Sequence, residues 1–350
     1  MRRREFVTSV VASTASAWLA GCSLRRAGAG TPSRPVPAGR IMTVQGWIDA
    51  RDMGVTLPHE HMLASFQPYD EWTRQPIPYD ADEVVRVVLP RLQRLRALGC
   101  RTFVDATAVG LGRDPVVLRR LAEASGLHVL TTTGAYAARE LVHLPPYVRT
   151  DTVEALADRW VEEWTGGIEH TGVRPGFIKL GFNGRALSDV ERRMIRAAAL
   201  THKRTGLTIG AHTGPAVAAF EQLDALEREQ VHPSAWIWIH AQNEPSSASH
   251  IAAARRGAWV EFDGIDASSL DRHVDCVTRL RDAGLLDHVL VSQDAGWYQV
   301  GTPGGGTFRS YETIFRSFLP ALRARGFDDA EIDLLMRRNP AAAFTVSVRG

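Results

Sequence analysis

The chain has 350 residues, of which 45% are hydrophobic and 23% are charged. These fractions are typical of a folded globular protein and exclude wholesale disorder, a collagen-like fibre and a polytopic membrane protein. The formal net charge is +2, so the charge balance does not point to a nucleic-acid partner, and the three cysteines form neither a Cys-x-x-Cys pair nor a disulfide framework.

An export signal is predicted at the N-terminus. Three arginines, Arg2 to Arg4, precede a largely apolar run from Phe6 to Leu19. This run is shorter than the roughly 20 residues that a membrane-spanning helix needs, and the layout is typical of a cleaved export signal. The segment Arg3-Arg4-Glu5-Phe6-Val7 resembles the twin-arginine signal, whose pathway exports proteins that have already folded.

Cys22 is predicted to carry a lipid anchor. Leu19-Ala20-Gly21-Cys22 resembles a bacterial lipobox, and acyl chains on the cysteine would hold the protein at a membrane surface. The alternatives are an ordinary cleaved signal with a chance cysteine, or a misplaced start codon. We therefore expect a signal peptide over 1–21, a lipidated Cys22 and flexible linker over 22–40, and one folded domain over 41–350. The protein would then be exported, as a periplasmic or extracytoplasmic lipoprotein anchored to the membrane.

From residue 41 onward the chain contains short strand-like runs. A hairpin is expected first, over Ile41–Ile48. Eight apolar runs rich in β-branched residues follow, at Val55–Leu57, Thr102–Val104, His128–Leu130, Phe177–Leu180, Thr208–Gly210, Trp236–Ile239, Trp259–Phe262 and Val289–Ser292. Runs of this length fit strands that are buried on both faces, as parallel sheets require.

Helices are predicted between these strands and after the last one. They cover Asp82–Leu98, Pro115–Ala124, Thr152–Gly166, Asp189–Thr205, Ala216–Glu229, Ser246–Arg256, Ser269–Ala283, Tyr311–Arg325 and Asp328–Arg338. Eight strand–helix units predict an α/β fold of the closed (β/α)8 TIM-barrel type. A doubly wound open sheet is the alternative, but the chain lacks the Gly-x-Gly-x-x-Gly turn of that class.

Polar side chains gather where the predicted strands end. In such a barrel the reacting groups lie at the carboxyl ends of the strands. The residues found there are His59, His61, His212, His240 and Asp294. A lone histidine after a strand is more often a hydrogen-bonded loop residue than a ligand. Placement of four histidines and an aspartate at strand ends on one face favours a metal site, and His59 and His61 are spaced so that both imidazoles reach one ion.

Lys179 is one of only two lysines in the chain and lies inside the apolar run Phe177–Leu180. A buried ammonium group is costly unless it is paired or neutralised. Reaction of the amine with carbon dioxide would give an N6-carboxylate whose two oxygens could bridge two divalent cations. The alternative is a buried salt bridge with Asp105 or Glu261, and the sequence does not separate the two.

These residues carry a resemblance to a known family. The matching segments, in chain order, are Gly54–His61, Val104–Thr107, Gly110–Pro115, Thr133–Tyr136, Phe177–Lys179, Ala211–Gly214, Ser292–Asp294 and Asn339-Pro340. Together they resemble the phosphotriesterase family of the amidohydrolase superfamily, from residue 41 to about residue 345.

The resemblance implies a binuclear metal hydrolase on a (β/α)8 barrel. His59, His61 and Asp294 would hold the more buried cation, and His212 and His240 the more exposed one. A carboxylated Lys179 and a hydroxide would bridge the two. Zinc is the usual assignment, although manganese, cobalt or iron also suit such ligands. Two cations lower the pKa of a bridging water and polarise the bond to be attacked, and Asp294 could take the proton that is released.

A second group of residues is expected to contact a small-molecule substrate, namely Tyr136, Arg185, Asp263, Trp297 and Tyr298. Arg185 could bind a carboxylate or phosphate. Trp297 and Tyr298 lie in the loop Ala295–Phe308, which we interpret either as a mobile aromatic pocket wall or as a packed surface loop.

The chain departs from the family pattern at three places. The aligned tyrosines beyond Tyr136 are absent, since Ala137, Ala138 and Arg139 follow it. Family members place an aspartate three residues after the histidine that ends strand six, but here Asn243 occupies that position and Glu244 follows it. The lactone-cleaving branch places an arginine after the aspartate that ends strand seven, but here Gly264 follows Asp263. These departures make acyl-homoserine lactones less favoured as substrates.

We therefore predict a metal-dependent hydrolase that cleaves an ester, lactone or phosphoester bond, with a carboxylic ester or lactone preferred. The alternatives are a mononuclear amidohydrolase, acting as an amidase or deaminase, and a non-catalytic exported binding lipoprotein. A homodimer is suggested by the resemblance alone.

Overall fold

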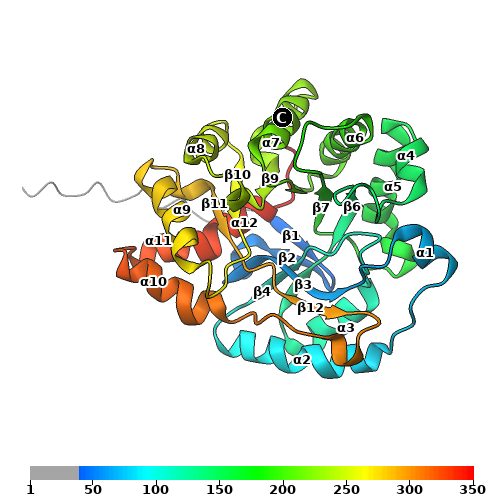
Figure 1. Cartoon of the computed structure of the whole chain (residues 1–350), viewed down its shortest axis with the longest axis horizontal. Coiled ribbons are helices and arrows are strands. Elements are labelled where there is room, and N and C mark those ends of the chain that lie inside the picture. Colours follow the sequence, from blue (N-terminus) through cyan, green and yellow to red (C-terminus); the bar gives the residue numbers. More distant parts are fainter. Residues whose placement is uncertain (1–38) are drawn as a thin grey trace, which may run out of the picture. The chain divides into compact units, whose positions relative to one another are not determined.

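Strands and helices alternate along the chain in this computed structural model, which describes residues 39–350 (Figure 1). The predicted signal peptide, Cys22 and all but the end of the predicted linker lie outside the described residues. The described residues belong to one compact unit. None of their helices combines the length and apolar character needed to cross a membrane.

The strands form a hairpin and two parallel sheets. Their bounds are β1 Arg40–Thr43, β2 Gly46–Asp49, β3 Thr56–Ala64, β4 Thr102–Asp105, β5 His128–Leu130, β6 Thr132–Tyr136, β7 Phe177–Gly181, β8 Ile209–His212, β9 Trp236–Ile239, β10 Trp259–Phe262, β11 Val289–Val291 and β12 Gly296–Gln299. β1 and β2 pair antiparallel. One sheet has the order β11-β10-β9-β8-β7-β6 and the other the order β12-β3-β4-β5. Within both sheets the paired strands are parallel.

The hairpin and all eight predicted core strands are therefore confirmed, with two differences. The predicted third strand is β5, but an additional strand, β6, follows it after the single residue Thr131. The loop after β11 contains a further strand, β12, which pairs with β3.

Apolar residues fill the space on both sides of these strands. Every residue of β7 and of β9 is buried, as expected for parallel strands that are covered on both faces. One apolar cluster joins Phe177 of β7 and Trp259 of β10 to Ile41 of the hairpin. A larger cluster joins the strands to the helices that Figure 1 shows arranged around them.

Helices connect successive strands and close the chain. The α-helices are α1 Tyr69–Arg74, α2 Ala81–Ala97, α3 Pro115–Ser125, α4 Pro146–Thr150, α5 Val153–Gly166, α6 Asp189–Thr205, α7 Ala216–Arg228, α8 Ser247–Arg255, α9 Leu270–Asp282, α10 Leu319–Ala324, α11 Asp329–Asp333 and α12 Asn339–Phe344. The predicted helices match these within a few residues, except near the C-terminus. The short helices α1 and α4 were not predicted.

Local sequence signals set the ends of several helices. Asp114 caps α3 by accepting hydrogen bonds from two backbone amides, and Pro115 occupies the first turn. Ser188 and Glu191 form a capping box at the start of α6, and Gly206 ends that helix with φ 75°.

The two predicted C-terminal helices are interrupted by π-helical turns, at Ile314–Phe318 and Leu334–Arg338. Each π-helical turn is followed, two residues after its end, by a proline, Pro320 or Pro340. Proline cannot donate the helical hydrogen bond and crowds the carbonyl one turn earlier, which a wider turn relieves.

The segment that follows β11 is hydrogen-bonded to β3 through the backbone. Asp294 N donates to His59 O at 3.1 Å, and His61 N donates to Ala295 O at 3.0 Å. Buried Glu60 accepts hydrogen bonds from the Ser292 hydroxyl and from the Ala295 backbone. These contacts place the carboxyl end of β11 beside that of β3, where the candidate site lies.

Candidate metal centre

Six predicted ligand residues line one small pocket at the carboxyl ends of the strands. The pocket has a volume of about 170 Å³, and the six are His59, His61, Lys179, His212, His240 and Asp294. His59 and His61 lie on β3, Lys179 on β7 and His212 at the end of β8. His240 directly follows β9, and Asp294 lies between β11 and β12. The structure thus brings together His59 and Asp294, which are 235 positions apart in the sequence (294 − 59).

The neighbours of three histidines fix which ring nitrogen faces the pocket. His59 Nδ1 lies 2.9 Å from Glu261 Oε1 and 3.2 Å from Asp263 Oδ2. Burial alone would raise the pKa of Asp263, but His240 and His59 hold that pKa well below its ordinary value. The Asp263 carboxylate can therefore only accept a hydrogen bond, so this Nδ1 carries the proton and Nε2 keeps a free lone pair. His240 Nδ1 lies 2.5 Å from Asp263 Oδ1. By the same reasoning it carries the proton, and His240 Nε2 keeps a free lone pair.

His61 is oriented by a hydroxyl group. The Thr107 hydroxyl donates to the backbone carbonyl of Leu63 at 3.1 Å and lies 2.7 Å from His61 Nδ1. Because its hydrogen is committed to Leu63, the hydroxyl accepts a hydrogen bond from Nδ1, and again Nε2 remains free. Outer partners of this kind orient metal-binding histidines in proteins.

Within the part of the chain that the structure describes, two groups of three residues have ligand atoms close enough to hold an ion. One is His59, His61 and Asp294, and the other is His59, His240 and Asp263. In the second group Asp263 already accepts hydrogen bonds from both rings. We therefore interpret Asp263 as a residue that orients the two histidines and not as a metal ligand. The first group faces the pocket, and its nitrogen and oxygen donors suit zinc and other divalent transition metals.

The carboxylate of Asp294 lies in surroundings that would suit a bound cation. Its Oδ1 lies 3.1 Å from His61 Nε2 and 3.7 Å from His59 Nε2, yet this buried oxygen has no hydrogen bond of good geometry. Burial alone would raise the pKa of Asp294, but the neighbouring His61, His59 and His240 hold that pKa below its ordinary value. A metal-binding carboxylate must be ionised, so this donor set fits a cation.

Lys179 has no carboxylate oxygen within 4.0 Å of its amine among residues 39–350, so the alternative salt bridge with Asp105 or Glu261 is not formed. The amine lies 3.3 Å from His59 Nε2, and the residue is only 2% exposed. Burial lowers the pKa of Lys179, against the opposing charge of Glu261. Asp105 instead accepts hydrogen bonds from the backbone amides of Met62 and Thr107.

His212 completes the set on the outer side. Its ring lies 4.3 Å from that of His240, measured between centroids, and the Tyr136 hydroxyl lies 3.2 Å from its Nδ1. Burial, followed by the charges of His240 and Lys179, holds the pKa of His212 well below its ordinary value. A neutral imidazole is the form that binds a metal.

An aromatic stack forms one wall of the pocket. The Trp297 ring lies 4.0 Å from the His61 ring on one side and 5.3 Å from the Phe66 ring on the other. The guanidinium of Arg139 lies over the Phe66 ring, 5.9 Å from its centroid. Leu111 and Tyr136 add further apolar lining.

The predicted substrate residues divide into two groups. Tyr136 and Trp297 line the pocket, whereas Arg185, Asp263 and Tyr298 do not. Tyr298 is buried in the outer apolar cluster, because successive residues of β12 face opposite sides and Trp297 takes the pocket side. Arg185 is exposed and pairs with Glu140 at 3.1 Å.

Asn243 and Glu244 occupy the place after β9 where the chain departs from the family pattern, and neither lines the pocket. Asn243 is exposed, and Glu244 accepts hydrogen bonds from the backbone amides of Ala216 and Ser246 at 2.9 Å each. Glu244 therefore caps the turns that lead into α7 and α8, and it is not placed to replace the missing aspartate.

Phe66 and Arg139 are pocket residues that we did not predict from the sequence. Both lie in loops beyond the strand ends, where the conformation is not set by strand periodicity. One signal of function is visible only in the structure. Nine non-glycine residues among 39–350 have positive φ, and the four that line the pocket are Arg139, His240, Asp294 and Trp297. Backbone conformations of this kind cluster at functional sites.

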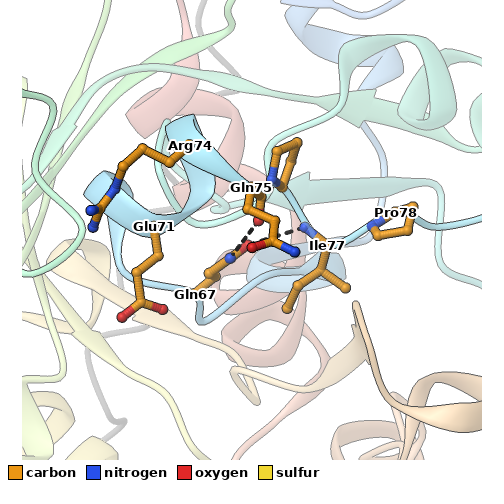
Figure 2. A pocket seen from close by; sticks show the side chains of 7 residues that line it. Gln67, Glu71, Arg74, Gln75, Ile77 and Pro78 are labelled. Atoms are coloured by element: carbon orange, nitrogen blue, oxygen red, sulfur yellow. Dashed lines mark hydrogen bonds between the residues drawn. The ribbon is translucent and has the colours of Figure 1, made fainter.

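A larger hollow, of about 550 Å³, lies over the loop that contains α1 (Figure 2). The Gln67 side chain closes this loop by donating to Gln75 O at 2.8 Å and accepting from Ile77 N at 3.2 Å. Glu71 and Arg74 are its only charged lining residues. Among residues 39–350, the candidate metal-ligand groups lie at the smaller pocket and not in this hollow.

The chain is similar to known proteins of one family. A model described as the phosphotriesterase family matches residues 39–344. The phosphotriesterase homology protein of Mycobacterium tuberculosis is 29% identical over 322 residues, covering 87% of this chain and 97% of that protein. The aryldialkylphosphatase of Saccharolobus solfataricus is 27% identical over 315 residues, covering 85% and 97%. A solved structure concerned with engineering organophosphate hydrolysis activity from a weak promiscuous lactonase template matches with a TM-score of 0.78 at 28% identity, covering 87% of this chain and 99% of that chain.

Proposed function

The chain belongs to the phosphotriesterase family, and from this premise we propose that it is a binuclear metal-dependent hydrolase that cleaves a carboxylic ester or lactone. Membership makes it a metal-dependent hydrolase of this family. The number of metals, their identity and the type of bond are our proposal. The observation that carries it is the convergence of free histidine Nε2 atoms on Lys179 and Asp294 in one buried pocket.

We further propose that the two sheets are parts of one closed (β/α)8 barrel. At one joint the chain runs from β5 into β6 through the single residue Thr131. At the other, the backbone hydrogen bonds of Asp294 and Ala295 to β3 join the β11 region to the opposite sheet. A closed ring explains why side chains from β3, β7 and β8 meet at one end.

His59, His61 and Asp294 would hold one cation, and His212 and His240 the second. Lys179 would join them as an N6-carboxylate. The amine, whose pKa is lowered by burial, would add to carbon dioxide. A new N–C bond would form, one C=O π bond and one N–H bond would break, the proton would pass to water, and the product would be an anion with two oxygens. Zinc is the metal that we propose, and bound divalent cations supply an activated water and polarise the bond to be cleaved.

The chain's own residues prepare this chemistry. Asp263 and Thr107 hold the histidine rings so that their Nε2 atoms face the pocket. Asp294 Oδ1, which lacks a hydrogen-bond donor, is placed to accept the proton that the attacking water loses. The Trp297 ring covers His61 and limits the access of bulk water to it.

The proposed bond type is supported by the relatives. One structural relative derives from a lactonase template, and a sequence relative is named as an aryldialkylphosphatase. Both bonds are attacked at an electrophilic centre by an oxygen nucleophile. We place the ester or lactone first, because the same nucleophile can cleave a phosphotriester as a side activity.

A hydrolysis panel tests this proposal. Metal-replete protein would be assayed with aryl esters, lactones, an aryl dialkyl phosphate and anilides, beside the His59→Ala variant. We expect the parent to turn over esters or lactones fastest and the variant to lose at least about a hundredfold in kcat/KM, the scale at which loss of a main electrostatic group acts. Turnover of anilides alone would favour the mononuclear amidohydrolase alternative, and no turnover at all would favour the binding lipoprotein.

We also propose that the protein is exported and anchored through lipidated Cys22. This rests on the twin-arginine-like and lipobox-like segments of residues 1–22. Labelled palmitate should be incorporated into the parent and not into Cys22→Ser. Label in neither chain would contradict the anchor.

A further inference from the structure

Arg139 lies at the rim of the metal pocket, outside the ligand set. It follows β6 in a short loop and lines the pocket together with Phe66 and Trp297. Its guanidinium stands over the Phe66 ring at 5.9 Å, Phe66 stacks on Trp297, and Trp297 stacks on the candidate ligand His61. A continuous aromatic surface therefore leads from Arg139 to the site of cleavage.

The charge of Arg139 is not used by the protein itself. Within residues 39–350, no Asp or Glu oxygen lies within 4.0 Å of its guanidinium, and its guanidinium donates no hydrogen bond. The adjacent Glu140 pairs with Arg185 instead. Among the described residues that line the pocket, Asp294 is the only one with a carboxylate, and it is directed at His61 and His59. An anion that enters the pocket would therefore find a free guanidinium.

The loop holds this arginine in place. Arg139, Glu140 and Leu141 have consecutive positive φ angles of 59°, 56° and 65°, which non-glycine residues rarely adopt. Asn183 fixes the loop, because it accepts from Glu140 N at 3.1 Å and donates to Ala137 O at 3.2 Å. Glu191 in turn accepts from Asn183.

We propose that Arg139 is a specificity-determining residue that binds an anionic group, a carboxylate or sulfonate, at the end of the substrate remote from the bond cleaved. The substrate is then an ester or lactone with an apolar middle, which lies along the aromatic surface, and a charged end. This inference rests on the proposed function. A planar guanidinium can form two parallel hydrogen bonds to such an anion.

The experiment compares charged and neutral forms of one substrate. Mono-4-nitrophenyl esters of adipate, suberate and sebacate keep a free carboxylate, and their methyl esters remove the charge while keeping the chain. The three chain lengths place the free carboxylate at three different distances from the ester bond, so that one of them can match the distance between Arg139 and the site of cleavage. The full-length, metal-replete chain would be assayed beside Arg139→Gln, with Arg185→Gln as the matched control on an exposed arginine outside the pocket.

We expect at least one anionic ester to be preferred over its methyl ester by about tenfold to a hundredfold in kcat/KM, which is the scale of a charge-assisted hydrogen bond. Arg139→Gln should abolish the preference, mainly by raising KM for the anionic ester. Arg185→Gln should keep the preference. Equal turnover of both forms by the parent, or a preference that survives in Arg139→Gln, would overturn the proposal while the proposed hydrolase stands.

A binding measurement covers the case in which no ester is cleaved, which would count against the proposed function. The non-cleavable ether 6-(4-nitrophenoxy)hexanoate and the corresponding alcohol would be titrated by calorimetry into the same three proteins. Tighter binding of the anion to the parent and to Arg185→Gln, but not to Arg139→Gln, supports the role of Arg139. The same dissociation constant for the anion in all three proteins would overturn it.

Discussion

At the scale of single residues, Asp263 determines which way two of the candidate ligands face. It is fully buried and accepts hydrogen bonds from the Nδ1 atoms of His59 and His240 and from the side chain of Gln242. It is therefore a positioning residue, although its place at the end of β10 led us to predict a substrate contact.

Replacing Asp263 should weaken metal binding without removing a ligand. In Asp263→Asn the amide can no longer accept from both rings, so the histidines lose their preferred orientation. We expect metal affinity to fall by about 10- to 100-fold, the usual cost of losing such an outer partner. Competition with a chromogenic chelator measures it, with the exposed Asp271→Asn as control. Equal affinity in parent and variant would show that Asp263 does not position the rings.

Glu191 is a second buried carboxylate with a positioning role, here for the loop that carries Arg139. Burial alone would raise its pKa, but hydrogen bonds from Ser188 and Asn183 bring that pKa below its ordinary value. A carboxyl group whose folded pKa is depressed stabilises the fold above its unfolded pKa, and the stabilisation is lost as the pH falls through the folded pKa.

Glu191→Gln should therefore destabilise the protein in a pH-dependent way. We expect a loss of about 1–3 kcal/mol in the free energy of unfolding at pH 7, as for a buried acceptor that loses its bonds, and a smaller loss near pH 4. Urea unfolding at the two pH values measures the difference, beside the exposed Glu162→Gln. A loss that is the same at both pH values would contradict the role of the ionised carboxylate.

At the scale of elements, the strands next to Lys179 lie close together. Gly134 on β6 is the register partner of Lys179 on β7. It has a φ of 109°, and a Cβ added there would overlap the backbone carbonyl oxygen of Lys179. A glycine is thus required where the two strands approach each other beside the site.

Gly134→Ala should be much more damaging than Gly99→Ala. Gly99 has a similar φ of 101°, but a Cβ there would meet nothing within 4 Å, so both variants carry the backbone strain and only one carries the clash. We expect about 1 kcal/mol of destabilisation for Gly99→Ala and more than about 3 kcal/mol for Gly134→Ala, measured by chemical unfolding. Similar losses in the two variants would mean that β6 and β7 can separate without cost.

The elements also show how far the sequence predicts this structure. Apolar runs locate the hairpin and the eight core strands, because burial on both faces leaves a continuous apolar pattern. Residues at strand ends, such as His61 and His212, meet in the structure because parallel strands end at the same side. The position of Arg139 was not predictable, since it depends on a hydrogen bond from the backbone of Glu140 to Asn183, 43 positions away.

At the scale of the whole molecule, the central claim is that one pocket holds two metal ions through six residues drawn from distant parts of the chain. The fold explains the meeting of these side chains. The most specific feature is the buried Lys179, which has no carboxylate partner among residues 39–350. In our proposal the lysine connects the two halves of the ligand set, so its removal should affect both metals.

The most direct test is the metal content per chain, measured by mass spectrometry of the full-length protein prepared with added zinc and bicarbonate, beside Lys179→Ala. We expect close to two metal ions per parent chain and clearly fewer in the variant. One ion in both proteins would contradict a lysine-bridged pair and favour a mononuclear amidohydrolase. Absence of metal from both would contradict the hydrolase itself.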